Sequence, residues 1–212
     1  MSDPRFGQCV ELLLAQQIIC PVEHKLLFDY LDDDRNRLQV REYLAPLNRD
    51  IRHTSDREAF LCAYKDVTDP TSKSECKAYF RHIALDIQPL VQWLCLVMDL
   101  RPTGRPLRTG DKLSKAELLT RIEGSPVFAE RLADLARQKL FGSKSQEPQG
   151  QLQQICSKLT DLGYLKPIGH SGITFLATGK WSVLYDQLGF IKSYEKLEEP
   201  EDDGQGILID VG

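Results

Sequence analysis

Arginine is the residue type whose spacing most clearly indicates a binding chemistry in this chain. Five arginines lie close together, in and just after a stretch of helical periodicity: Arg35, Arg37, Arg41, Arg49 and Arg52. A planar guanidinium group can bind a phosphate through two parallel N–H groups, so such a cluster can contact a nucleic-acid backbone. Acidic residues interrupt the cluster at residues 32–34 and at Asp50. Two interpretations therefore stay open, a weak contact with double-stranded DNA and an ordinary solvated face.

A second and sparser basic group is expected around the helix at 152–161 and the hairpin that follows it. It comprises Lys158, Lys166 and His170, with Asp161 beside them. His170 stands between glycines in an expected turn, where an ordinary surface residue is the simplest interpretation and where the position also allows contact with a partner or with DNA.

Catalytic chemistry has little support in the sequence. Phosphate-binding, dinucleotide-binding, nucleophile-elbow and zinc-protease motifs are all missing. The four histidines are isolated from one another, and three successive aspartates at residues 32–34 are better explained as a solvated turn than as a metal site. Six scattered cysteines without a CxxC pair favour free thiols in a reducing compartment. We expect no enzyme, no metal and no cofactor.

The first third of the chain changes from a helical period to a strand period. Helices are expected at 4–18, 23–32 and 35–47, and strands at 49–54 and 59–65. Three short helices followed by a hairpin describe a winged helix-turn-helix domain.

The same order then repeats after a long helix. That helix is expected at 72–100, kinked or divided at Pro89, with its second half deeply buried. A capping box at Ser114–Glu117 begins a short helix. Further helices are expected at 126–140 and 152–161, after a polar loop at 141–151, with Gly163 as a C-terminal cap. Strands at 164–168 and 173–177 and a closing helix at 180–194 complete the pattern.

The fold class that follows is mainly α with small β-hairpin wings, two tandem winged helix-turn-helix domains joined by a long helix. The expected divisions are a first domain at 4–68, the linking helix at 72–100, whose second half is shared with the second domain, a second domain at 101–194 and a flexible acidic tail at 195–212. The net charge of −4 is uneven, because this tail holds seven acids against Lys196. It can be a solvated arm, a competitor for the basic surface or, through ILIDV, a docking strand.

The arrangement resembles the MukE/MksE subunits of bacterial condensin-like SMC complexes, in the tandem winged-helix, kleisin-interacting (KITE) class. The similar stretches are residues 24–64, the apolar LVQWLCLVMDL, GDKLSKAELL, and QLQQICSKLTDLGYLKPIGHSGITFLAT. These stretches span about residues 5–194, and the acidic tail that follows also fits the family.

The resemblance implies a non-enzymatic subunit that dimerises, binds the kleisin, and so assists the SMC ATPase indirectly in compacting and segregating chromosomal or plasmid DNA. It implies a cytoplasmic, nucleoid-associated protein with weak DNA contact that is not sequence-specific. The N-terminus lacks a secretory signal, and no membrane association is expected. Apolar side chains at 90–98 and 181–190 are expected to pack partly between domains and partly in a homodimer.

A winged-helix transcriptional regulator is the alternative. It would need a strongly basic recognition helix and usually a ligand-binding domain, which the sequence does not show.

Overall fold

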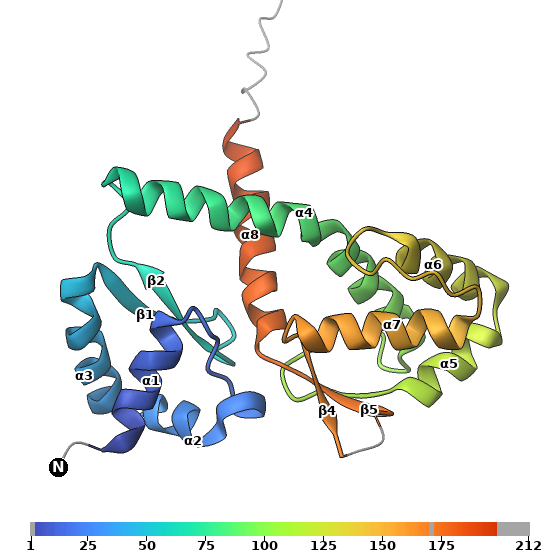
Figure 1. Cartoon of the computed structure of the whole chain (residues 1–212), viewed down its shortest axis with the longest axis horizontal. Coiled ribbons are helices and arrows are strands. Elements are labelled where there is room, and N and C mark those ends of the chain that lie inside the picture. Colours follow the sequence, from blue (N-terminus) through green and yellow to red (C-terminus); the bar gives the residue numbers. More distant parts are fainter. Residues whose placement is uncertain (1–2, 170–171, 199–212) are drawn as a thin grey trace, which may run out of the picture.

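The chain folds into two helical units that stand side by side (Figure 1). The computed structural model describes residues 3–169 and 172–198. Within those residues the fold is mainly helical, with small antiparallel sheets. Buried apolar side chains of this described part form two clusters, one from elements before residue 65 and one from Leu90 onward. We call these two parts the N-terminal unit and the C-terminal unit.

The N-terminal unit packs three helices against a hairpin. Its elements are α1 (Pro4–Leu14), α2 (Pro21–Asp32), α3 (Asp34–Leu44), a 3-10 turn (Ala45–Leu47), β1 (Arg49–His53) and β2 (Phe60–Tyr64). Ile19, between α1 and α2, pairs with Phe60 of β2 in an isolated bridge. The helix expected at 4–18 therefore ends earlier, at Leu14, because Gln16 has a φ of +60° and the chain turns there into an extended segment.

The C-terminal unit repeats this order with one additional helix. Its elements after α4 (Pro70–Leu100) are β3 (Lys112–Ser114), α5 (Lys115–Glu123), α6 (Pro126–Arg137), α7 (Pro148–Asp161), β4 (Leu165–Ile168), β5 (Thr174–Ala177) and α8 (Lys180–Glu198). The sheet order is β3-β5-β4, all antiparallel. Strand β3 was not expected, since three residues directly before a helix give no alternating pattern. The Ser114 side chain caps α5, as the capping-box prediction requires.

Two further boundaries differ by four residues from the sequence-based expectation. Helix α7 begins at Pro148, so the polar loop expected at 141–151 is shorter. Proline fits the first turn of a helix because its missing N–H has no intrahelical partner there. Helix α8 continues to Glu198, so the residues 195–198 assigned to a flexible tail are helical. The rest of that tail, residues 199–212, lies outside the described residues.

Helix α4 belongs to both units and is continuous from Pro70 to Leu100, not divided at Pro89. Its C-terminal half supplies Leu90, Trp93, Leu96 and Val97 to the core of the C-terminal unit. Within the described part of the chain, α4 alone is long and apolar enough to cross a membrane. Core helices pass the same test, and this half of α4 is a core helix.

The two units touch at the tip of the β1–β2 hairpin. Thr54 and Ala59 at this tip are fully buried, and the backbone N–H of Ser55 donates to the Asp186 carboxylate of α8 at 2.9 Å. Gly179, just before α8, lies against Cys20 and Ala59 so closely that a Cβ there would stand 2.6 and 2.7 Å from their Cβ atoms. We call this contact the inter-unit joint.

A second contact lies where α8 crosses α4 (Figure 1). The Tyr79 hydroxyl accepts a hydrogen bond from the Gln187 side-chain amide at 3.0 Å. The rings of Phe80 and Phe190 stack with centroids 5.9 Å apart. Together with the inter-unit joint, this crossing fixes α8 at two points along its length.

Replacing Gly179 by valine is expected to destabilise the protein by about 1–3 kcal/mol, because the joint has no room for a side chain. Urea unfolding measures the change. The matched control is Gly189→Ala in the same helix, where nothing lies within 4 Å of an added Cβ. Alanine there is expected to raise stability by about 0.5–1 kcal/mol. Equal behaviour of the two variants would show that Gly179 is not a packing constraint.

Candidate nucleic-acid interface

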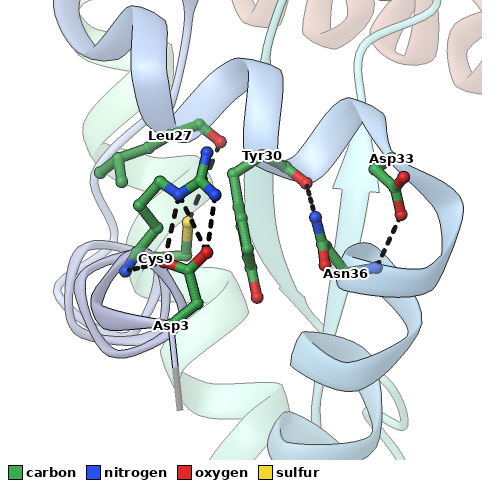
Figure 2. A network of polar contacts seen from close by, with 7 residues as sticks. Asp3, Cys9, Leu27, Tyr30, Asp33 and Asn36 are labelled. Atoms are coloured by element: carbon green, nitrogen blue, oxygen red, sulfur yellow. Dashed lines mark hydrogen bonds and ion pairs between the residues drawn. The ribbon is translucent and has the colours of Figure 1, made fainter. Parts of the chain in front are cut away.

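Helix α3 is held on α2 by polar contacts, which fixes the direction of its arginines. Figure 2 shows Asp33 accepting a hydrogen bond from the backbone N–H of Asn36 at 3.2 Å, while the Asn36 side chain donates to the carbonyl of Tyr30 at 3.1 Å. Asp33 also caps α3 through the N–H of Arg35. With the buried Val40 and Leu44 facing the core, the outward face of α3 carries Arg35, Leu38 and Glu42.

Arg37 points inward and has a structural role. Its side chain is only 25% exposed. The guanidinium donates to the carbonyl of Leu31 at 2.9 Å, where α2 ends, and pairs with Asp34. It also lies 5.9 Å from the centre of the Phe60 ring. These contacts satisfy a terminal carbonyl of α2, so Arg37 is not available to a ligand without breaking them.

Arg41 and Arg52 share one carboxylate. Asp50, which is 13% exposed, accepts from Arg41 Nε at 2.9 Å through one oxygen and pairs with Arg52 Nε at 3.0 Å through the other. The two arginine side chains remain 50% and 60% exposed. One positive charge of this group is therefore uncompensated and faces solvent.

Arg49 is turned toward the start of α4. Its side chain is 19% exposed, lies 3.5 Å from the centre of the Tyr64 ring and donates to the Tyr64 hydroxyl at 2.7 Å. Glu75 of α4 lies 3.6 Å away. A surface hollow of about 250 Å³ lies beside Arg49. It is lined by Arg41, Ala45, Arg49, Asp50, Arg52 and Lys65.

The charge of this surface is balanced by its own acids. Residues 32–52 contain five arginines and five acidic residues, so the segment has no net charge. Among the residues of this cluster, Arg35 is exposed and has no ion-pair partner in the described part of the chain. The structure thus brings Arg41, Arg49 and Arg52 together, but it leaves a mixed face and not a strongly basic one.

The residues predicted in the C-terminal unit are not close to this surface. Lys158 is half-buried on α7. The ammonium group of Lys166 donates to the carbonyl of Val22 at 2.7 Å, so Lys166 contributes to the contact between the units. His170 lies outside the described residues. At the β1–β2 hairpin, Thr54 and Ala59 are buried in the inter-unit joint, whereas Ser55, Asp56 and Arg57 of the turn between them are exposed.

The sequence-based reasoning passed over a basic loop in the C-terminal unit. Residues 101–115, between α4 and α5, carry five basic residues against Asp111, a net charge of +4: Arg101, Arg105, Arg108, Lys112 and Lys115. A count of charge along the chain would have found this loop, because it contrasts with the balanced segment 32–52.

Two buried thiols of the described cores are held in their neutral forms. Burial raises the pKa of Cys156 to about 12 and that of Cys9 to about 11. A thiol with such a pKa is a poor nucleophile at neutral pH. Across residues 3–169 and 172–198 no group of three or more histidine, cysteine or acidic side chains could hold a metal ion.

Comparison with models of protein families gave no match, and a search of the curated proteins gave no significant match.

Arg37→Ala is expected to lower the free energy of unfolding by about 1–2 kcal/mol, because the carbonyl of Leu31 loses its donor. Arg35→Ala is the matched control and should change stability by less than about 0.5 kcal/mol, since its side chain is exposed. Thermal or urea unfolding of both variants measures the difference. An equal, small effect of both would contradict the structural role of Arg37.

Proposed function

We propose that the chain is a non-enzymatic accessory subunit of a condensin-like SMC complex, built from two winged-helix domains that bind the kleisin. The observation that carries the proposal is the repeated order of elements. Each unit runs from a helix through a short extended segment to further helices and a closing hairpin, and in each the extended segment pairs with the second hairpin strand, at Ile19–Phe60 and at β3–β5. Winged-helix domains have this order.

The linking helix supports the same proposal. Helix α4 leaves the hairpin of the N-terminal unit and becomes the first core helix of the C-terminal unit. The two domains are therefore joined by a shared helix and not by a flexible linker. The resemblance to the MukE/MksE subunits implies this architecture.

A transcriptional regulator is less well supported by the charge distribution. Such proteins place a basic helix in the major groove and often contact the backbone with the wing. Here residues 32–52 have no net charge, Leu38 is 53% exposed on the outward face of α3, and the first hairpin is packed against α8 through the residues that flank its turn, Thr54 and Ala59. These features favour contact with proteins over sequence-specific reading of DNA.

The proposed partners are the kleisin, the SMC ATPase through the kleisin, double-stranded DNA bound weakly and without sequence preference, and a second copy of the chain. The apolar stretch 90–98 is largely buried in the core of the C-terminal unit. Its exposed apolar surface is therefore smaller than the sequence indicated, and less of it can contribute to a dimer interface. Exposed apolar side chains instead lie on the first half of α4 and on α8, at Tyr79, Phe80, Leu85 and Phe190. The proposed location is the cytoplasm, on the nucleoid.

Co-expression with the kleisin and the coiled-coil ATPase of the same genome tests this function. The chain is expected to co-purify with the kleisin alone through size exclusion, and with the ATPase only when the kleisin is present. A chain that associates with neither protein, or with the ATPase without the kleisin, would contradict the proposal.

Deleting residues 199–212 is expected to strengthen DNA binding at low salt and to leave kleisin affinity nearly unchanged. The deletion removes five acidic side chains that can compete for a basic surface, yet leaves α8 intact. The matched control keeps the length of the tail and neutralises the acids, as E199Q, E201Q, D202N, D203N and D210N. Loss of the kleisin from the deletion but not from the neutralised variant would identify ILIDV as a docking strand.

A further inference from the structure

The loop that joins α4 to β3 presents positive charge on a rigid frame. Its buried anchor is Leu107, which is 1% exposed and whose carbonyl accepts a hydrogen bond from the Tyr185 hydroxyl at 2.9 Å. The N–H of Gly110 donates to the carbonyl of Ala177 at 2.8 Å, next to β5. The loop is thus fastened to both α8 and the sheet, although it has no regular secondary structure of its own.

Asp111 organises the base of the loop. Its carboxylate accepts hydrogen bonds from Arg105 at 2.7 Å and from the backbone N–H of Arg108 at 3.0 Å, and it pairs with Arg101 at 3.0 Å. Burial raises the pKa of Asp111, but these hydrogen bonds and the charge of Arg101 outweigh burial and hold the pKa below its usual value. The carboxylate therefore stays ionised and neutralises Arg101, which is 14% exposed.

The remaining charges face solvent. Arg105 is 42% exposed, and Arg108 and Lys112 are exposed. In the described part of the chain the side chains of Arg108 and Lys112 have no hydrogen-bond or ion-pair partner. Because the loop is fixed and these cations are exposed and unpaired, they are accessible to an external anion.

The composition of the loop selects among anionic ligands. Its other exposed residues are Pro102, Thr103, Gly104, Pro106 and Gly110, none of them aromatic. Sites for single-stranded nucleic acid stack bases on aromatic side chains, and protein interfaces concentrate aromatic anchors. A membrane-bound surface needs an apolar face to insert. Cations without apolar anchors instead match the regular phosphate backbone of duplex DNA.

We propose that residues 101–112 form a contact for the phosphate backbone of double-stranded DNA, with Arg108 and Lys112 as the principal contacts and Arg105 as a third. This inference rests on the DNA-binding part of the proposed function and locates that binding on the C-terminal unit, away from α3. Each phosphate contact contributes roughly −0.9 to the slope of log affinity against log salt concentration.

The test compares two double variants that remove the same charge. R108Q with K112Q acts on the loop, and R35Q with K65Q acts on exposed cations of the N-terminal unit. Binding of a labelled DNA duplex is measured by fluorescence anisotropy over a range of salt concentrations. The loop variant is expected to flatten the slope by about 1.8, and the control by less than about 0.5. The single variant R108K keeps both positive charges of the loop, and its salt slope should equal that of the wild-type chain.

Three outcomes overturn the inference in distinguishable ways. Equal flattening by both variants would mean that total charge alone governs binding. A larger effect of R35Q with K65Q would place the contact on the N-terminal unit, so that DNA binding stands and the loop does not. A wild-type chain without measurable duplex binding would remove the DNA-binding part of the proposed function as well, while co-purification with the kleisin still tests the rest.

Discussion

The close approach of backbone and side chains at Gly179 is the constraint on which the relation of the two units depends. Because this position has no Cβ, Cys20 and Ala59 can reach the start of α8, and Thr54 and Ala59, which flank the turn of the first hairpin, are buried. Two structural consequences follow from that contact. The backbone N–H of Ser55 comes within hydrogen-bond distance of Asp186, and Lys166 comes within hydrogen-bond distance of Val22. Lys166, which the sequence indicated as a DNA contact, is thereby used to join the two units.

The second unifying element is helix α4, which is anchored at both ends. At its start, the Asn48 side chain donates to the Ser72 hydroxyl at 3.1 Å and to the carbonyl of Asp66 at 2.8 Å. At its end, Trp93 and Val97 are fully buried in the core of the C-terminal unit. A helix fixed in this way transmits the position of one unit to the other, whereas a flexible linker would not. The fold of this chain therefore determines how the exposed surfaces of the two units are placed relative to each other.

Much of the local structure follows from the sequence because single residues determine it. Gly163 takes a φ of +76° after α7, and Asp33 caps α3, as glycine and aspartate do at helix ends. The tertiary partners of the charges could not be read in this way. Nothing near Arg37 in the sequence shows that it turns toward Leu31, and Lys166 meets a carbonyl 144 residues away. Spacing along the chain identified which arginines are neighbours, but only packing decides which of them keep a free positive charge.

The basic loop and the inter-unit joint meet on the same part of α8. Ser182, which is buried, lies 3.1 Å from the Thr109 hydroxyl of the loop and also hydrogen-bonds Asp56 at the hairpin tip. Burial raises the pKa of Asp56, yet hydrogen bonds from Thr54, Ser182 and the Glu58 backbone lower it below its usual value, so the charge is retained inside the joint. Ser182 of α8 therefore contacts both the basic loop and the turn of the first hairpin. The candidate DNA contact is in this way joined to the N-terminal unit by side-chain contacts on α8, in addition to the chain that links them.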